Sequence, residues 1–320
     1  MKAIRVQQFG GPEVLKIEEV PVPEPGAGQV LVRVKAVGVN PVETYIRSGG
    51  YATLPPLPYT PGRDAAGVVE AAGAGVQDVR VGDRVFTSDS VTGSYAEYTV
   101  CDAADVHPLP ENISFAQGAA LNIRYGTAYR ALFQRARAKA DETVLIHGGS
   151  GGVGTAAIQF ARAAGLKVFA TAGTQRGREL VLQQGAHRVF DHHAADYLQQ
   201  IMDATEGRGV DVVLEMLANV NLGKDLGILA KGGRVIVIGS RGSVEINPRD
   251  LMLREAEVLG LLLFHATPDE RRAIYGAIVD GLKKGELTPV VGRELPLADA
   301  PAAHEAVMQP GAFGKIVLIP

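Results

Sequence analysis

The chain has 320 residues, a formal net charge of -3, 46% hydrophobic residues and 21% charged residues. One hydrophobic core rarely serves this length, so we expect two domains. The negative net charge gives the protein no general attraction to nucleic acid or to an anionic membrane surface. Cys101 is the only cysteine, which excludes an intrachain disulfide and a thiolate metal cluster. With no signal-peptide pattern and no apolar run of membrane-spanning length, a cytoplasmic location is expected.

The first 120 residues or so are predicted to be mostly β. Short runs rich in Val, Ile, Phe and Tyr alternate with turns rich in Gly and Pro, which is typical of a compact barrel-like β domain. The predicted strands span residues 4–9, 15–20, 30–39, 66–71, 84–87 and 96–100.

A strand, a glycine turn and a helix follow one another over residues 143–164. Residues 144–146 form a short apolar run, and Gly149, Gly151 and Gly154 fit the pattern G-x-G-x-x-G. Bare glycines let the backbone approach a pyrophosphate, and the start of the helix offers unpaired N–H groups and a positive dipole end. In this strand–turn–helix context the motif predicts a dinucleotide site.

Strands and helices alternate regularly from this motif onward. Strands are expected at 144–147, 167–171, 188–190, 211–215, 235–238 and 257–263, with helices between them. Such alternation predicts a parallel, doubly wound Rossmann sheet in an α/β protein, with ligands at the carboxyl ends of the strands. A helix over 126–138 leads into the motif. A helix over 269–284 and a last strand over 316–319 are expected to return to the first domain. The predicted boundaries are 1–122, 123–264 and 265–320.

The phosphorylated cofactor NADPH is favoured over NADH. NAD-binding folds carry an acidic residue about 20 positions beyond the glycine motif. Residues 171–178 contain no Asp or Glu there, but they include Arg176 and Arg178. These arginines and His192, after the third strand, are candidates to bind the 2′-phosphate, because guanidinium groups pair strongly with phosphate. The alternative, that both arginines only solvate the start of a helix, stays open.

Several stretches resemble the zinc-free, zeta-crystallin-like quinone oxidoreductases of the medium-chain dehydrogenase/reductase superfamily. They include FGGPEVL at 9–15, GVNPVETYIRSG at 38–49, GTAYRAL at 126–132, HGGSGGVG at 147–154, EMLANVNL at 215–222 and GSRG at 239–242. The resemblance implies a GroES-like β-barrel catalytic domain around an inserted Rossmann domain, a homodimer or homotetramer, and a substrate cleft between domains. It also implies NADPH-dependent reduction of a small-molecule quinone, by hydride or one-electron transfer.

Two other functions stay open beside quinone reduction. An enone or alkenal double-bond reductase would need the same cofactor and pocket. RNA binding is a second role associated with zeta-crystallin-like proteins, but the sequence has no RNA-reading motif and no basic aromatic run.

Zinc is not expected. The resemblance places Asn40 where zinc-bearing relatives have a cysteine, Gly62-Arg63-Asp64 where they have a glycine–histidine–glutamate motif, and Ile123 near their last cysteine. One cysteine in the whole chain cannot replace such a ligand set. A quinone suits a site without a Lewis acid, whereas an alcohol–ketone interconversion would leave its alkoxide without metal stabilisation.

Candidate site residues follow from the resemblance and from the expected sheet edge. Asn40, Tyr45 and Tyr51 are the catalytic candidates; the alternatives are structural tyrosines and a turn residue before Pro41. Arg241 could instead be a surface charge. The predicted cofactor contacts are Tyr45, Thr127, Ser150, Gly151, Gly152, Val153, Gly173, Arg178, His192, Asn221, Ile238, Gly239, Ser240, Arg241, Leu261, Leu262 and Leu263.

Overall fold

A computed structural model describes residues 1–320, and spatial contacts divide the chain into two compact units. The β unit comprises Met1–Ile123, Val279–Pro310 and Gly314–Pro320. The Rossmann unit comprises Arg124–Ile278 and Gly311–Phe313. The sequence placed the return to the first domain at residue 265, whereas this division falls within helix α9 (Pro268–Lys284).

The β unit is built around the long strand β3 (Gln29–Gly38). Val30 and Val32 point into a core with Val69, Val85 and Cys101, whereas Val34 and Val37 belong to a second core. A seven-stranded sheet has the order β14-β15-β3-β4-β5-β7, with β6 also pairing with β3, and only β14 and β15 run parallel. Its other strands are β4 (Ala65–Ala72), β5 (Arg84–Thr87), β6 (Tyr98–Asp102), β7 (Val106–Pro108), β14 (Val291–Pro296) and β15 (Lys315–Ile319).

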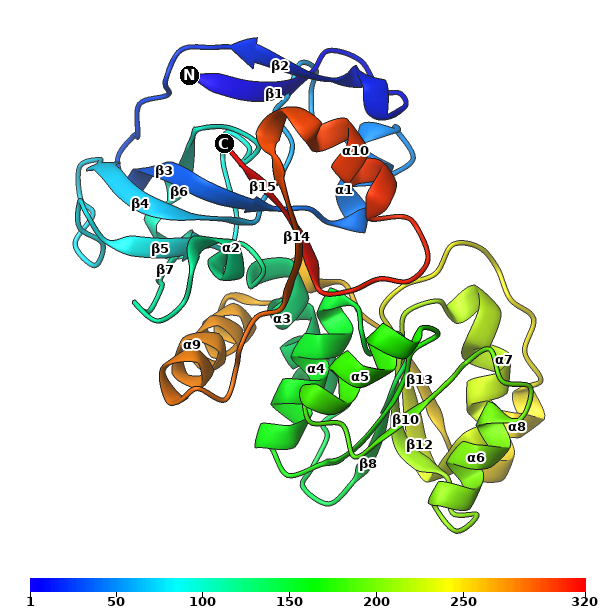
Figure 1. Ribbon diagram of the computed structural model, residues 1–320. Coiled ribbons are helices and arrows are strands. Elements are labelled where there is room, and N and C mark those ends of the chain that lie inside the picture. Colours follow the sequence, from blue (N-terminus) through cyan, green and yellow to red (C-terminus); the bar gives the residue numbers. More distant parts are fainter. The chain divides into compact units, whose positions relative to one another are not determined.

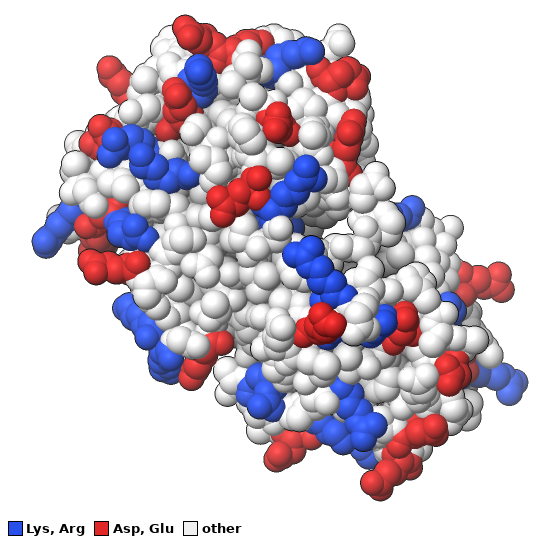
Figure 2. Space-filling model, in the orientation of Figure 1, with Lys and Arg blue, Asp and Glu red and all other residues white.

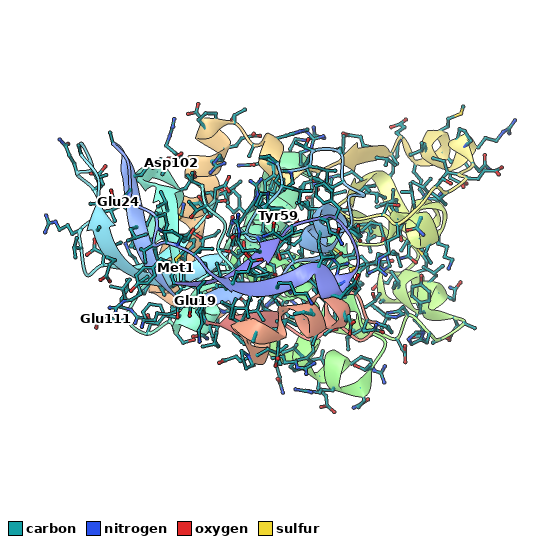
Figure 3. The ribbon with its side chains drawn as sticks, turned by 90° about the horizontal axis from the view of Figure 1, so that it is seen from above. Met1, Glu19, Glu24, Tyr59, Asp102 and Glu111 are labelled. Carbon is teal, nitrogen blue, oxygen red and sulfur yellow. The ribbon has the colours of Figure 1, made fainter.

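A hairpin and three short helices complete the β unit. Strands β1 (Lys2–Val6) and β2 (Leu15–Glu19) pair so that Met1 and Glu19 lie beside each other (Figure 3). Helix α1 (Pro41–Arg47), which the sequence did not predict, begins with a proline at its first position, where the missing N–H costs nothing. It packs against α10 (Ala300–Ala306), as Figure 1 shows, and α2 (Phe115–Gly118) packs on the sheet.

The Rossmann unit contains the predicted parallel, doubly wound sheet. Its strand order is β10-β9-β8-β11-β12-β13, and every neighbouring pair is parallel. Leu145 and Phe169 pack under α6 and α7, and helices α4 and α5 lie on the other side of the sheet (Figure 1). The strands are β8 (Thr143–Ile146), β9 (Lys167–Thr171), β10 (Arg188–Phe190), β11 (Val210–Glu215), β12 (Leu229–Val237) and β13 (Glu257–Gly260). The helices after β8 are α4 (Gly152–Ala163), α5 (Gln175–Gln183), α6 (Tyr197–Ala204), α7 (Ala218–Ile228), α8 (Pro248–Arg254) and α9.

Two sequence expectations at the ends of the Rossmann segment have different outcomes. The final strand does return to the first domain, because β15 lies between β14 and β3. The helix expected at 126–138 instead begins as α3 (Asn122–Tyr129) and continues as a π-helix over Arg130–Arg135. None of the helices combines the length and the apolar character that a bilayer crossing requires.

Candidate functional site

The glycine turn between β8 and α4 lies at the carboxyl edge of the Rossmann sheet. A Cβ atom on Gly154 would overlap the carbonyl oxygen of Gly148, so only glycine lets α4 pack so closely on the turn. The first intrahelical hydrogen bond runs from Thr155 N–H to Gly151 O at 2.8 Å. The N–H groups of Gly152 and Val153 precede it and are the ones a pyrophosphate would meet.

Two other predicted residues of this turn have partners within the protein. The N–H of Gly151 donates to Gly148 O at 3.0 Å, and the hydroxyl of Ser150 donates to Ala312 O at 2.8 Å. Ser150 therefore ties the turn to Gly311–Phe313, the short segment that belongs to the Rossmann unit although its flanks do not.

Arg124 is a functional candidate that the sequence did not reveal. Its guanidinium lies directly over the Cα atom of Gly152, where any side chain would overlap it, and the residue is only 8% exposed. It brings a positive charge to the N-terminal end of α4, where the helix dipole already favours anions. The glycine motif gives no signal for it, because Arg124 comes from the preceding helix α3.

Residues after β9 and β10 form the candidate site for the 2′-phosphate. A Cβ atom on Gly173 would lie 2.5 Å from Nε2 of His193 and 2.8 Å from Nε2 of His192, so both imidazole rings lie against this glycine. Arg178 lies in the first turns of α5, and its guanidinium makes a 2.7 Å ion pair with Asp191. The other predicted arginine, Arg176, stacks on the ring of Phe313 at 3.9 Å.

An acidic residue, Asp191, follows the third strand, β10, whereas residues 171–178 after the second strand contain none. A hydrogen bond from the backbone N–H of His193, with the nearby Arg178 charge, lowers the pKa of Asp191, so it is anionic at neutral pH. Burial and the neighbouring His193 lower the pKa of His192. A 2′-phosphate here would have to share Arg178 with a carboxylate.

The turns after β11 and β12 are joined to each other. The carbonyl of Gly239 accepts from Ala218 N–H at 2.9 Å, and Asn219 Oδ1 accepts from Arg241 N–H at 2.8 Å. Asn221 donates to Glu215 Oε1 at 3.2 Å. Two segments far apart in the sequence thus form one rim. The remaining predicted residues of this rim, Ile238, Ser240 and Arg241, are half-buried or exposed.

The last predicted cofactor segment follows β13. Leu261 N–H donates to Val237 O at 3.0 Å, which leaves the segment running along the sheet edge. Leu262 is 40% exposed, whereas Leu263 is buried and lies close to Gly126 of α3. Thr127 is buried on the same helix. Contacts of these residues with the cofactor stay predictions.

In the β unit, two residues that the resemblance aligns with zinc-binding motifs, Asn40 and Asp64, contact a lysine. The ammonium of Lys315 lies 2.6 Å from Asp64 Oδ2 and 2.7 Å from Asn40 Oδ1, and the amide of Asn40 donates to Asp64 Oδ2 at 2.9 Å. The backbone N–H of Ile123 donates to the other oxygen of Asp64. Lys315 and Asp64 are fully buried, so the pair has no solvent screening.

This donor set does not fit a zinc ion. Zinc sites in proteins use thiolate and imidazole ligands with carboxylates, whereas here an amide and a carboxylate already compensate an ammonium. The positive charge that a metal would bring is supplied by the side chain of β15.

A second layer of polar groups extends this cluster. Glu43 accepts from the Asn40 amide at 3.2 Å and from the Tyr95 hydroxyl at 2.7 Å. Burial and the charge of Asp64 raise the pKa of Glu43 to about 7. The imidazole of His304 lies 3.1 Å from the Tyr95 hydroxyl, and burial lowers its pKa to about 3, so it is neutral. We call Asn40, Glu43, Asp64, Tyr95, His304 and Lys315 the Lys315 cluster.

The three catalytic candidates lie on or beside α1. Asn40 is 1% exposed and its amide is engaged with Asp64, Glu43 and Lys315, so its contact with an acceptor stays a prediction. Tyr45 on α1 and Tyr51 in the following loop are both half-buried. A turn holds this loop, with Gly50 N–H donating to Tyr45 O at 2.9 Å. Their roles also stay predictions.

Comparisons with known proteins agree with this arrangement. Residues 26–111 match the family model "Alcohol dehydrogenase GroES-like domain", and residues 152–278 match "Zinc-binding dehydrogenase". The chain is 54% identical to a quinone oxidoreductase of Rattus norvegicus and 52% identical to one of Homo sapiens. Each alignment covers 100% of this chain and 98% of the relative.

Solved structures are similar over the whole chain. A quinone oxidoreductase of Escherichia coli, complexed with NADPH, superimposes with a TM-score of 0.88 at 31% identity. An NAD-dependent alcohol dehydrogenase superimposes with a TM-score of 0.93 at 30% identity. Both alignments cover 100% of each chain. The full-length identity above one half, together with the GroES-like and Rossmann units, means that this chain belongs to the zeta-crystallin-like quinone oxidoreductases of the medium-chain dehydrogenase/reductase superfamily.

Proposed function

We propose that this protein is an NADPH-dependent quinone reductase that works without zinc. The observation that supports the proposal is the Lys315 cluster: Asn40 and Asp64, which the resemblance aligns with zinc-binding motifs of relatives, already bind an ammonium. Full-length identity to quinone oxidoreductases supports the substrate class, and the NADPH complex of a structural neighbour supports the cofactor.

The residues of the Rossmann unit have distinct proposed tasks in binding. The N–H groups of Gly152 and Val153 and the charge of Arg124 receive the diphosphate at the start of α4. Arg178 and His192 receive the 2′-phosphate, with Arg178 partly released from Asp191. When bound, NADPH supplies the reducing equivalents, as a hydride or as single electrons.

The β unit supplies the surroundings of the acceptor in this proposal. The phenol rings of Tyr45 and Tyr51 offer flat faces for a quinone and hydroxyl groups for its oxygens. Asn40 holds the start of α1, and thereby Tyr45, through the Lys315 cluster. A quinone gains aromaticity on reduction, so it needs no Lewis acid, and its protons can come from water.

The decisive experiment compares acceptors and cofactors with the same purified protein. We expect turnover of ortho- and para-quinones with NADPH, a lower kcat/KM with NADH, and slow or no turnover of enones, alkenals and simple alcohols. Metal analysis should find no stoichiometric zinc. Strong turnover of an enone alone would make the protein a double-bond reductase, and preference for NADH would remove the proposed role of Arg178 and His192.

We further propose a cytoplasmic homodimer or homotetramer, as the family resemblance suggests; light scattering of the purified protein and cell fractionation test this. RNA binding is not favoured. On the face seen in Figure 2, Lys and Arg residues are interspersed with Asp and Glu and form no continuous basic stripe. RNA retardation that NADPH abolishes would support the second role.

A further inference from the structure

Three ionisable side chains are buried together at the carboxyl edge of the Rossmann sheet. His147 follows β8, Glu215 ends β11, and Asp225 comes from α7. Nε2 of His147 lies 2.9 Å from Asp225 Oδ1 and 3.5 Å from Glu215 Oε2. Glu215 and Asp225 are 0% exposed and His147 is 4% exposed. We call these residues the buried triad; the glycine turn, the 2′-phosphate candidates and the Lys315 cluster do not include them.

Two oxygens of the triad lack a hydrogen-bond donor when both carboxyl groups are treated as ionised. They are Oε2 of Glu215 and Oδ2 of Asp225, and both are buried. An oxygen of Glu215 and an oxygen of Asp225 lie within 4.8 Å of each other, so a proton held between the two carboxyl groups would supply the missing donor. A protonated His147 then donates to Asp225 through Nε2 and faces the Thr171 hydroxyl with Nδ1 at 3.4 Å. With one imidazolium, one carboxylate and one carboxylic acid, the triad has no net charge, as a fully buried group requires.

The electrostatic surroundings agree with this assignment. Burial raises the pKa of Glu215 to about 7; the charge of His147 opposes this, and the charge of Asp225 and its hydrogen bond with Glu215 add to it. Burial alone would lower the pKa of His147, but the hydrogen bond and charge of Asp225 raise it. The other titratable groups that act on the triad are Lys224 of α7, Tyr197 of α6 and His192 after β10.

The other carboxyl oxygen of Glu215, Oε1, and its backbone carbonyl accept hydrogen bonds from the turns that form the predicted cofactor rim. Glu215 Oε1 accepts from the Leu217 N–H and from the amide of Asn221. The backbone carbonyl of Glu215 accepts from the N–H groups of Ile238 and Gly239. One residue therefore connects the buried triad with the turns after both β11 and β12.

We propose that Glu215 is a positioning residue for cofactor binding: as a neutral carboxylic acid it donates its proton to Asp225 and fixes the segment 216–221, with Asn221, in the geometry that receives NADPH. The inference rests on the proposed NADPH-dependent function. It assigns the residue a task that neither the glycine motif nor the Lys315 cluster performs.

A divalent cation is the competing occupant of such a set of side chains. Ligands bound tetrahedrally to zinc at its usual bond lengths lie roughly 3.3 Å apart. The 2.9 Å contact between His147 and Asp225 is shorter and has the length of a charge-assisted hydrogen bond. The geometry therefore favours a hydrogen bond between His147 and Asp225 over a metal ion bound by both.

Two substitutions at one position separate these possibilities. In Glu215→Gln, the amide N–H₂ can donate to Asp225 and the amide oxygen can accept from Leu217 and Asn221, so every hydrogen bond of the neutral acid is reproduced. In Glu215→Met, the shape is kept and all of them are lost. We expect the NADPH Kd, measured by titration calorimetry at pH 7, to rise by about two- to tenfold per lost hydrogen bond in Glu215→Met, and Glu215→Gln to restore it.

The pH profile gives a second readout. The neutral acid is lost as pH rises through about 7, the pKa of Glu215. The wild-type Kd should therefore increase between about pH 7 and pH 9, where the phosphates of NADPH no longer titrate. Glu215→Gln should show a flat profile over this interval. If Glu215→Met fails to fold, judged by circular dichroism, this comparison of wild type with Glu215→Gln still decides the question.

Several outcomes would overturn the inference. If Glu215→Gln bound NADPH as weakly as Glu215→Met, an ionised carboxylate would be needed at this position. If the wild type contained a stoichiometric divalent metal that Glu215→Gln lacked, the triad would be a metal site. Equal binding by all three proteins would remove the positioning role. Failure of the wild type to bind NADPH would refute the proposed function instead, and the pH dependence of thermal unfolding in wild type and Glu215→Gln would still report the shared proton.

Discussion

Lys315 is the only cation in contact with the buried carboxylate of Asp64. Lys315→Met keeps the length of the side chain but leaves this charge uncompensated, so we expect the free energy of unfolding in urea to fall by about 3–5 kcal/mol. Arg33→Met is the matched control, because its ion pair with Glu70 is nearly half exposed on both sides and should be worth less than about 1 kcal/mol.

The double variant Lys315→Met/Asp64→Asn should recover part of this loss, because it removes the charge as well as its partner. If Lys315→Met were as stable as the wild type, another group would have to neutralise Asp64, and the argument against zinc at these positions would lose its structural basis.

Glu43 makes the free energy of unfolding depend on pH, and the raised pKa of its carboxyl group sets the direction of this dependence. Its pKa is raised from 4.5 to about 7, so the folded state binds more protons between these values, and the free energy of unfolding falls as pH rises through this interval. Glu43→Gln does not titrate, so its stability relative to wild type should improve by up to about 3 kcal/mol from pH 4.5 to about pH 8.

Urea unfolding at several pH values measures this difference. His304→Gln is an informative control, because the lowered pKa of His304 has the opposite sign: its contribution to stability is lost as pH falls below 6.5 toward 3. A constant difference between Glu43→Gln and wild type at all pH values would contradict a neutral Glu43.

The functional candidates that could not be predicted from the sequence were missed for a common reason. Arg124, Lys315 and the buried triad act on partners far away in the chain, such as Lys315 on Asn40, and no local pattern records such pairs. The glycine turn could be predicted because its whole mechanism lies within a few residues. Asp191 was missed because the acidic residue was sought after the second strand, whereas the fold presents one after the third.

At the scale of elements, the strand–turn–helix at the glycine motif gives a sharp test. Gly154→Ala would press its methyl group against the backbone of Gly148 and Gly149, which cannot rotate away. We expect α4 to shift from the turn and the NADPH Kd to increase by at least tenfold, because the N–H groups of Gly152 and Val153 lose their alignment.

Gly276→Ala is the control for this change. Gly276 lies within α9 with nothing near its would-be Cβ atom, so alanine should leave NADPH binding unchanged and stabilise the helix by about 0.5–1 kcal/mol. Unchanged NADPH affinity in Gly154→Ala, measured by the same calorimetric titration, would argue against the turn as the diphosphate site.

Elements with a clear hydrophobic pattern in the sequence could be predicted, whereas short elements could not. The six parallel strands follow from apolar runs and intervening helices, which carry their signal over many residues. Helix α1 has seven residues and follows directly on β3, so it shows no helical period of its own. The π-helix after α3 widens the turn, and its sequence resembles an ordinary helix.

At the scale of the whole molecule, the two units have separate cores and should respond separately to perturbation. NADPH at 100 times its Kd should stabilise the Rossmann unit by about 2.7 kcal/mol. Lys315→Met should shift only the transition of the β unit. Hydrogen exchange followed along the chain can assign each change, and protection by NADPH confined to the β unit would contradict this division.

The place of Lys315 in the chain has a consequence for the order of synthesis. The ammonium that neutralises Asp64 lies on β15, 251 residues further along the chain. The β unit thus stays electrostatically incomplete until β15 has left the ribosome. The strands of the Rossmann unit, which lie between Asp64 and β15 in the sequence, emerge before that. We expect the nucleotide-binding half to mature first, and the half that carries the tyrosines to complete its sheet only once β15 has emerged.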